Sequence, residues 1–370
     1  MKVLIPVLHY WPVIGGLEAW TQNIAERISD KAEIFVVTGK VKNQPLEEVK
    51  NKVKISRVSL FFLKNLSYSS PVYILTTLPF IFFKSLNLIK KEKINLLHCQ
   101  GFSSSFVGFL LSRLTGIPYI VTVQRIERKG NIFKEMVYRR AFYCIGASRA
   151  VERYFEAIGA KNIEVIPNGI DLARFEGLNR QKARQKLGLG ENEFVVMTVA
   201  RLEKVKGIEH LIRAVNNFTL IIIGNGSERK NLEKLVRTLG LEKKVRFLGQ
   251  VPNKEILGYL IGADCFCLPS LREGFGIVVL EAQAAAIPVI GTKIGGILDL
   301  VEDQETGILV EPKNYQQIQE AVLKIQSNPG FAQNLVSNAK NNLKKYEWQN
   351  ISLRVFELYE NCYSHTNLSS

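Results

Sequence analysis

The segment Leu271–Gln283, "LREGFGIVVLEAQ", decides the fold, because it joins a strand to a helix through a glycine-flanked turn. The apolar run "CFCLPS" before it predicts a buried strand that ends at Ser270. A helix is expected to begin near Gly276. A buried strand, a glycine turn and a helix form the repeating unit of a parallel sheet that helices cover on both faces.

The same unit recurs along both halves of the chain. Strands are predicted in the first half at "KVLIPV", "EIFVVT", "VKISRVSL", "INLLHCQG", "PYIVTVQ", "YCIGAS" and "IEVIPN", and in the second at "FVVMTVA", "FTLIIIG", "VRFLGQV", "CFCLPS", "IPVIGT" and "GILVEP". The joint is expected at Pro167–Gly169. The sequence therefore predicts two doubly wound α/β domains: residues 1–170, to which a C-terminal helix at about 349–370 returns, and residues 171–348. Open α/β sheets bind ligands at the carboxyl ends of their strands, so two facing sheets predict a cleft between the domains.

The bulk composition is typical of a soluble globular protein. The chain has 370 residues, of which 46% are apolar and 22% are charged. The longest apolar run, Tyr73–Phe83, contains Pro79 and falls short of the roughly 20 residues that cross a bilayer. The first residues predict a buried strand rather than a signal peptide. Five cysteines without a C-x-x-C pair predict buried free thiols in a reducing cytoplasm.

The net charge of +15 is unevenly placed along the chain. Residues 1–170 carry 24 Lys and Arg against 12 Asp and Glu, whereas residues 171–370 carry 25 against 22. Such a basic half attracts anions, although a solvated basic surface that aids solubility explains it equally. A nucleic-acid binder is disfavoured, because no helix-turn-helix, zinc or base-stacking motif accompanies the charge.

Two cations lie in the loop after the predicted strand "FVVMTVA". Arg201 and Lys206 precede a helix that begins near Gly207, and cations beside a helix start form an anion site. Solvated loop cations are the alternative. In "IIIGNGSERKNLE", Gly224 and Gly226 indicate either a close approach to a ligand or a tight turn.

Glu273 and Glu281 should bracket the start of the helix that follows the opening turn. The turn amides at residues 274–276 suit a phosphate, and carboxylates on either side suit neutral hydroxyl groups. A nucleotide sugar has this layout, with Glu281 suited to the ribose and Glu273 to the sugar. Two surface glutamates without a ligand are the alternative interpretation.

We expect no metal and no cofactor. The sequence contains no D-x-D, and its four histidines (His9, His98, His210 and His365) are widely separated. Arg201 and Lys206 are placed to neutralise a diphosphate leaving group without a divalent ion.

Taken together, these segments resemble the retaining glycosyltransferases of group 1, also called family 4, which have the GT-B fold. The resemblance rests on "GGLEAW", "VARLEKVKG", "IIIGNGSERKNLE", "VRFLGQVPNKEI" and "ADCFCLPSLREGFGIVVLEAQAAAIPVIGTKIGGILDLVEDQETGILVEP". It implies an N-terminal acceptor domain, a C-terminal donor domain and a UDP- or GDP-sugar as the donor. It also implies same-face attack, in which the departing phosphate oxygen takes the acceptor proton.

The resemblance also implies roles for individual residues. Arg201 and Lys206 would bind the donor diphosphate, Glu281 the ribose, and Glu273 would orient the transferred sugar. The remaining donor contacts would come from the backbone: Phe275, Gly276 and Ile277 beside the sugar, Gly249 and Val251 in the loop that holds the base, and Gly15 and Gly16 closing over the phosphates.

Gln124 departs from the family pattern, since many relatives carry there a histidine that contacts the transferred sugar. An amide still forms hydrogen bonds but carries no charge. A catalytically weak or inactive nucleotide-sugar binder is therefore the alternative function. A phosphorylase or an epimerase would also suit the fold, although the E-x7-E context argues against the epimerase. His98 is a candidate acceptor contact, with a structural role at a strand end as its alternative.

Residues 60–95 mix apolar side chains with lysines and predict a face that rests on an anionic membrane, where a lipid-linked acceptor would be presented. The alternative is an ordinary core helix with a basic outer side. The residues concerned are Phe61, Phe62, Phe80, Phe82 and Phe83 beside Lys64, Lys84, Lys90, Lys91 and Lys93. We expect a cytoplasmic glycosyltransferase, peripheral on the inner face of the membrane, that acts on a glycan or a lipid-linked sugar.

Overall fold

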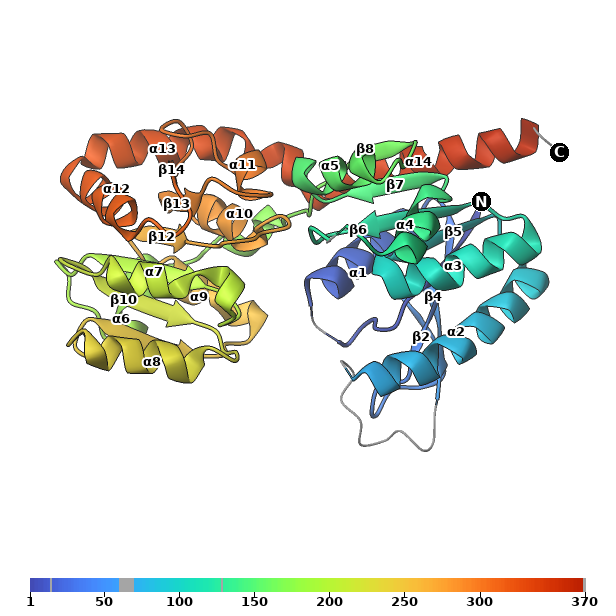
Figure 1. Ribbon diagram of the computed structural model, residues 1–370, viewed down its shortest axis with the longest axis horizontal. Coiled ribbons are helices and arrows are strands. Elements are labelled where there is room, and N and C mark those ends of the chain that lie inside the picture. Colours follow the sequence, from blue (N-terminus) through green and yellow to red (C-terminus); the bar gives the residue numbers. More distant parts are fainter. Residues whose placement is uncertain (14, 60–69, 128, 369–370) are drawn as a thin grey trace. The chain divides into compact units, whose positions relative to one another are not determined.

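The computed structural model describes residues 1–13, 15–59, 70–127 and 129–368 (Figure 1). The chain divides into two compact units, Met1–Gly169 with Trp348–Ser370, and Ile170–Glu347. Each boundary lies within one residue of the position expected from the sequence. Three of the residues named for the membrane prediction lie outside the described residues: Phe61, Phe62 and Lys64.

The first unit contains an eight-stranded sheet in the order β3-β4-β2-β1-β5-β6-β7-β8. Its pairs are parallel, except that β3 runs antiparallel to β4. The strands are β1 (Lys2–Pro6), β2 (Glu33–Gly39), β3 (Glu47–Lys50), β4 (Val53–Val58), β5 (Leu96–Gln100), β6 (Tyr119–Val123), β7 (Tyr143–Gly146) and β8 (Ile163–Val165). Seven of these were predicted, whereas β3 was missed because its charged, half-exposed sequence "EEVK" has no apolar run.

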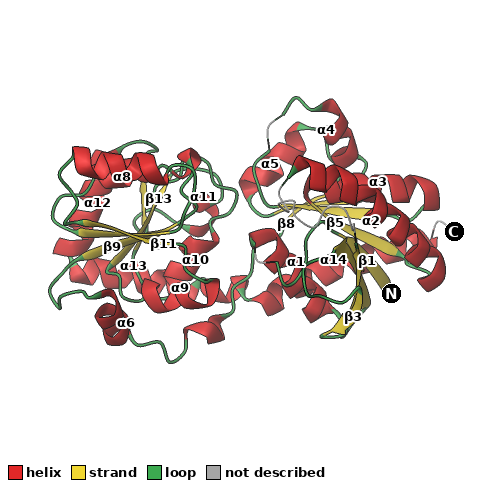
Figure 2. Ribbon diagram, turned by 90° about the horizontal axis from the view of Figure 1, so that it is seen from below, coloured by secondary structure: helices red, strands yellow, loops and turns green. Residues whose placement is uncertain are grey.

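Helices cover both faces of this sheet (Figure 2). One buried cluster joins the sheet to α1 and α14, and another joins it to α2, α3, α4 and α5. The helices are α1 (Gly16–Ile28), α2 (Pro71–Glu92), α3 (Gly101–Thr115), α4 (Ile132–Arg139), α5 (Arg149–Ala157) and α14 (Trp348–Leu368). The last helix therefore packs on the first domain, as its amphipathic sequence indicated.

The second unit contains a six-stranded parallel sheet in the order β11-β10-β9-β12-β13-β14. The strands are β9 (Val195–Val199), β10 (Thr219–Ile223), β11 (Val245–Gly249), β12 (Cys265–Leu268), β13 (Val289–Thr292) and β14 (Ile308–Val310). The helices are α6 (Arg180–Leu187), α7 (Ile208–Arg213), α8 (Arg229–Thr238), α9 (Asn253–Leu260), α10 (Ile277–Ala284), α11 (Ile297–Leu300), α12 (Tyr315–Ser327) and α13 (Pro329–Asn341), with 3₁₀ turns η2 (Leu172–Phe175), η3 (Lys204–Lys206) and η4 (Leu343–Tyr346). All six strands match the prediction, because continuous apolar runs bury both faces of a parallel strand.

In each sheet, the strand order reverses between two neighbouring central strands. In the second unit the chain winds from β9 toward β11 and then from β12 toward β14, so the reversal lies between β9 and β12. In the first unit it lies between β1 and β5. The connections after such strands diverge to opposite faces and open a crevice at their carboxyl ends, where α/β proteins bind ligands.

Helix α2 is longer than the sequence run suggested. It continues through Pro79 for 22 residues and is, by length and composition, apolar enough to cross a membrane. The expectation that this segment is too short was therefore wrong for the helix, because flanking residues extend the apolar run. One side of α2 packs on β1, β2 and β4. All five cysteines, which lie within the described residues, are buried thiols outside any disulfide, as predicted.

The two glycines of "GNG" allow the loops after β9 and β10 to touch. A Cβ on Gly224 would lie 1.9 Å from the carbonyl oxygen of Ala200, and one on Gly226 would lie 2.4 Å from that of Leu202. Gly224 also has a φ of +133°. The two glycines therefore serve close packing between the two loops, a role that neither interpretation of this motif named.

We predict that Gly224→Ala destabilises the second unit by at least about 2 kcal/mol, because the added Cβ meets backbone atoms and the φ angle is strained. Urea unfolding followed by circular dichroism measures the loss. Gly330→Ala is the matched control, since nothing lies within 4 Å of its added Cβ. Equal stability of the two variants would contradict the packing role of Gly224.

Candidate active site

The loop that follows β9 carries the two predicted cations to the point where the strand order reverses. Arg201 is exposed, and its Nη1 lies 2.8 Å from Oε1 of Glu203. Lys206 ends the short turn η3, and its side chain is only 18% exposed. The two cations therefore differ, since Arg201 remains in solvent whereas Lys206 is drawn into the protein.

Lys206 forms an ion pair with Glu273 from the loop after β12. Its Nζ lies 2.6 Å from Oε2 of Glu273, whose side chain is 12% exposed. The same oxygen accepts a hydrogen bond from Ser270 Oγ at 3.2 Å. An ion pair this far from solvent is held more firmly than a surface pair, and it joins the two loops that flank the reversal point.

Backbone contacts fix these two loops against each other. The amide of Leu271 donates to the carbonyl of Val205 at 2.7 Å. Gly207 adopts a φ of +61°, and a Cβ there would lie 2.2 Å from the carbonyl oxygen of Pro269. Only glycine permits this approach, which places Lys206 directly beside the end of β12.

Helix α10 begins four residues after Glu273. Gly276 caps its N-terminus with a φ of +95°, and Ile277 is the first helical residue. Phe275 is buried, and its ring lies 6.3 Å from that of Tyr346. A helix start leaves its first amide groups without intrahelical acceptors, so the ion pair and a partial positive charge lie side by side at this edge of the sheet.

Glu281 lies within α10, one turn beyond its start, and is half-buried. Burial raises its pKa to about 7, and the nearby Arg174 opposes that rise. A carboxylate with this pKa accepts hydrogen bonds well when ionised and is readily neutralised when nothing binds it.

The predicted base-binding loop follows the edge strand β11. Gly249 ends that strand with a φ of +76°, and its carbonyl accepts a hydrogen bond from the amide of Gly224 at 2.7 Å. Val251 is half-buried in the connection to α9. The loop thus lies two strands from β9 at the same carboxyl edge.

In the first unit, three predicted residues gather where β1 and β6 end. Gly15 caps α1 and Gly16 is its first residue. A Cβ on Gly16 would lie 4.0 Å from Oε1 of Gln124, the residue that follows β6. The buried Nε2 of Gln124 has no hydrogen-bond partner among the described residues. The neutral amide therefore has a hydrogen-bond donor available beside the glycine turn.

His98 is fully buried in β5. Its Nδ1 lies 2.6 Å from the hydroxyl of Tyr359 in α14, and its Nε2 lies 2.8 Å from the hydroxyl of Thr122 in β6. Burial lowers its pKa to about 3, so the ring is neutral. Because both ring nitrogens already have partners within the core, a structural role for His98 is favoured over the predicted contact with an acceptor.

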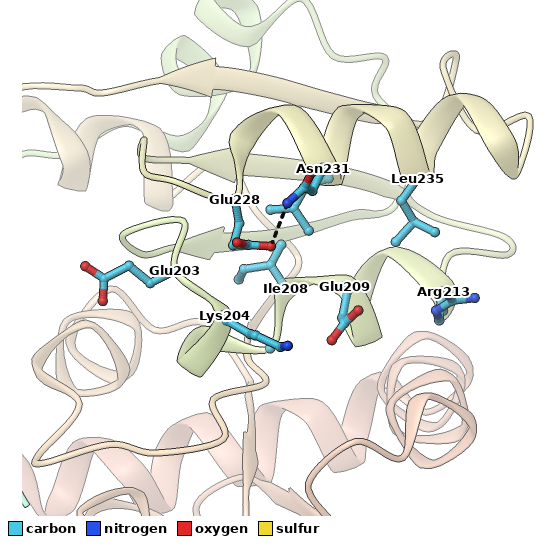
Figure 3. A pocket seen from close by; sticks show the side chains of 10 residues that line it. Glu203, Lys204, Ile208, Glu209, Arg213, Glu228, Asn231 and Leu235 are labelled. Carbon is cyan, nitrogen blue, oxygen red and sulfur yellow. Dashed lines mark hydrogen bonds between the residues drawn. The ribbon is translucent and has the colours of Figure 1, made fainter.

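A cavity of about 290 Å³ opens between α7 and α8 (Figure 3). None of the predicted site residues lines this cavity, although Glu203, which pairs with Arg201, does. Within it, Asn231 donates a hydrogen bond to Glu228 at 3.2 Å. The cavity is thus a neighbour of the ion-pair site rather than part of it.

Sequence reasoning missed three residues that shape the site. Ser270 donates to Glu273, and Arg174 acts on Glu281. Gly296 packs so closely that a Cβ would lie 2.4 Å from the Cα of Phe275. A glycine pair after the strand "IPVIGT" was the signal for Gly296, whereas nothing in the sequence places Arg174 near Glu281. Among the described residues, no group of three or more His, Cys, Asp or Glu side chains is placed to hold a metal ion.

Comparison with known proteins agrees with this architecture. The structure resembles sucrose-phosphate synthase from Thermosynechococcus elongatus, with a TM-score of 0.84 and 24% identity over 98% of this chain and 99% of that one. It also resembles the Anabaena protein HepE in complex with UDP, with a TM-score of 0.81 and 23% identity over 98% and 100% of the two chains. Two doubly wound domains of this kind define the GT-B fold of glycosyltransferases.

Sequence comparison then identifies the family. Residues 179–342 match the model of the glycosyl transferases group 1, and residues 14–174 match that of glycosyltransferase family 4. An uncharacterized glycosyltransferase of Methanocaldococcus jannaschii is 30% identical over 97% of this chain and 98% of its own. A D-inositol 3-phosphate glycosyltransferase of Corynebacterium jeikeium is 26% identical over 97% and 96%. The chain belongs to the group 1 glycosyltransferases, so the family inferred from its motifs is confirmed, whereas retention of configuration stays a prediction.

The raised pKa of Glu281 predicts a pH-dependent stability. A glutamate in the unfolded chain titrates near pH 4.3, so between there and about pH 7 the folded protein binds the extra proton. The free energy of unfolding therefore falls as pH rises through this window. Glu281→Gln removes the effect, and we expect its melting temperature relative to the parent protein to be higher at pH 8 than at pH 5.

The exposed Glu242 supplies the control, since Glu242→Gln also removes one carboxylate from the second unit. A melting-temperature difference for Glu281→Gln that is the same at both pH values would contradict the burial of an ionisable Glu281.

Proposed function

We propose that the protein transfers a sugar from a nucleotide-sugar donor to an acceptor with retention of anomeric configuration. The ion pair of Lys206 and Glu273, held where β9 and β12 diverge, is the observation that carries this proposal. A UDP-sugar is the favoured donor, because the similar HepE structures contain UDP and UDP-glucose. A GDP-sugar is the second candidate.

In the proposed reaction, the diphosphate of the donor lies beside Lys206 and the start of α10. The ammonium group has three donors, so it keeps its contact with Glu273 while it binds a phosphate oxygen. Arg201 is exposed on the same loop and adds a second cation. Both stabilise the negative charge that develops on the leaving diphosphate.

The bond changes balance without a further reactant. The bond between the anomeric carbon and the phosphate oxygen breaks, and an acceptor hydroxyl oxygen forms the new bond on the same face of the sugar. The hydroxyl proton passes to the departing phosphate oxygen, and a nucleoside diphosphate leaves. Glu273 orients the transferred sugar and balances the charge of Lys206, and it forms no bond to carbon.

The rest of the donor is assigned to the other residues of this edge. The ionised Glu281 would accept hydrogen bonds from the ribose, and the loop at Gly249 and Val251 would hold the base. The closure of Gly15 and Gly16 over the phosphates stays a prediction. So does a contact of Gln124 with the transferred sugar, for which its unpaired amide nitrogen is suited.

The acceptor is proposed to be a glycan or a lipid-linked sugar at a membrane surface. The basic first unit favours it, because residues 1–170 carry 24 Lys and Arg against 12 Asp and Glu. We place the activity in the cytoplasm, since all five cysteines, which lie within the described residues, are outside any disulfide.

A catalytically weak or inactive nucleotide-sugar binder is the second candidate function. The observation that favours it is Gln124, a neutral amide at the end of β6 where many relatives carry a histidine. This binder and the enzyme share a donor site and differ only in turnover.

We expect UDP-sugars to raise the melting temperature more than GDP- or ADP-sugars in a thermal-shift panel. A ligand present at 100 times its dissociation constant stabilises the folded state by about 2.7 kcal/mol. Stabilisation together with donor-dependent product supports the enzyme, and stabilisation without product supports the binder. No shift with any of the nucleotide sugars would contradict both.

Lys206→Ala should lower turnover on the order of 10²–10³-fold, because it removes one transition-state partner of the diphosphate. Glu273→Ala should have an effect of the same order. Initial-rate kinetics measures both variants. Lys204→Ala, on the same short turn η3 but with an exposed side chain, is the matched control and should stay near the parent rate. Near-normal turnover of Lys206→Ala would overturn the assignment.

Metal independence is part of the proposal, because the two cations take the role that a divalent ion would have. We expect turnover to persist in excess chelator. A loss of activity that added Mg²⁺ or Mn²⁺ restores would contradict it.

A further inference from the structure

Helix α2 packs one side into the first unit and exposes large apolar side chains on the other. The side that packs into the first unit is formed by residues four positions apart: Tyr73, Thr77, Ile81, Ser85 and Ile89. The outward side carries four large apolar residues: Val72 (52% exposed), Leu75 (70%), Phe80 (46%) and Phe83 (67%). We call these four the α2 face.

This pattern departs from that expected for a surface helix, because large apolar residues lie on both of its sides. Such a helix turns its apolar stripe to the core and its polar residues to water. Here two hydroxyl side chains, Thr77 and Ser85, point inward, while Phe80 and Phe83 lie in solvent. The inner side of α2 is thus that of an ordinary core helix, whereas its outer side is apolar at Phe80 and Phe83 as well as basic. Contiguous exposed apolar residues of this kind mark interaction surfaces.

Basic residues follow the α2 face toward the C-terminal end of the helix. Lys90, Lys91 and Lys93 are exposed, and Glu92 is the one acidic residue within α2. Lys84, half-way along, pairs with Glu47 of β3 at 2.5 Å. Of these lysines, Lys91 lies 3.9 Å from a carboxylate oxygen of Glu92. Apolar side chains beside the net positive charge that remains complement a surface that is apolar inside and anionic outside.

We propose that the α2 face is the surface by which this protein lies on an anionic lipid bilayer. The four apolar side chains enter the boundary between headgroups and acyl chains. Lys90, Lys91 and Lys93 contact the anionic headgroups. The helix lies in the membrane plane and does not cross it, because Ile81 and Ile89 on its other side are part of the buried cluster of the first unit.

The charge of the protein favours a bilayer over a second copy of this chain. Two copies would each bring a net charge of +15 and the same lysines to the contact, so they would repel each other. An acidic protein partner would also complement the positive charge of the protein. The experiment below distinguishes such a partner from a bilayer. A single protruding helix such as α2 also suits a lipid bilayer, because a fluid bilayer needs no groove that is complementary to the helix.

The first turn of α2 is connected to the glycine turn of the first unit. The ring of Tyr73 stacks on that of His9 with 5.9 Å between their centres. Nδ1 of His9 lies 3.7 Å from a carboxylate oxygen of Glu18, the side chain that packs against Gly15. A membrane held by α2 thus lies near the glycine turn that is proposed to close over the donor phosphates, which suits a lipid-linked acceptor. This last step rests on the proposed function, whereas membrane binding itself does not.

Vesicle flotation with the full-length protein tests the proposal. We expect it to float with vesicles of phosphatidylcholine and phosphatidylglycerol, and to float much less with phosphatidylcholine alone or in high salt. Each lysine near an anionic surface contributes about a fivefold change in partitioning, so Lys90→Glu/Lys91→Glu should lower it by on the order of 25-fold. Phe80→Ser/Phe83→Ser should lower it by at least about tenfold.

Matched controls come from the second unit. Leu239→Ser/Leu323→Ser removes two exposed apolar side chains, and Lys230→Glu/Lys234→Glu reverses two exposed charges on α8. Both should float like the parent protein. Melting curves by circular dichroism confirm that every variant is folded, and a thermal shift with UDP reports the donor site separately.

Two results would overturn the proposal. One is a parent protein that fails to float with anionic vesicles, and a retained UDP shift would then leave the proposed function standing. The other is a folded Phe80→Ser/Phe83→Ser variant that floats normally. If light scattering shows a dimer of the parent protein that this variant converts to a monomer, while neither floats, the α2 face is an interface between copies instead.

Discussion

The ion pair between Lys206 and Glu273 is the constraint on which the account of the donor site depends. Its partners come from loops that follow β9 and β12, the two strands between which the sheet reverses its order. Charges this close to the interior are stable only when they are paired and held in place. Gly207, which allows the first loop to touch Pro269, supplies that restraint. Sheet topology, glycine placement and charge thus converge on one position at the carboxyl edge.

The two units use the same topology with different chemistry. In the second unit the reversal point holds a lysine and a carboxylate, next to a helix start and a second carboxylate, Glu281, whose pKa burial raises to about 7. In the first unit the corresponding edge has a glycine turn and the neutral amide of Gln124, while the nearby His98 is withdrawn into the core. The charged residues proposed to bind a diphosphate are therefore in one unit, and the other offers neutral hydrogen bonding together with a net positive charge.

Much of the fold could be predicted because parallel strands are buried on both faces and so appear as continuous apolar runs. The exposed antiparallel strand β3 has no such run and was missed. The proximity of Lys206 and Glu273 followed from their places after two strands. The effect of Arg174 on the pKa of Glu281 depends instead on how the chain folds at the turn η2. The burial of His98 depends on Tyr359, which lies 261 residues away along the chain. The exposure of Phe80 and Phe83 on α2 could not be predicted without knowing which side of the helix packs on the sheet.

A double-mutant cycle on UDP affinity, measured by titration calorimetry, tests the central claim most directly. The cycle compares Lys206→Ala, Glu273→Gln and the double variant with the parent protein. If Glu273 holds Lys206 in place for the diphosphate, the two losses in binding free energy are not additive, with a coupling of roughly 0.5–3 kcal/mol. Strictly additive losses, or UDP affinity that neither substitution changes, would contradict the claim that this ion pair forms the donor site.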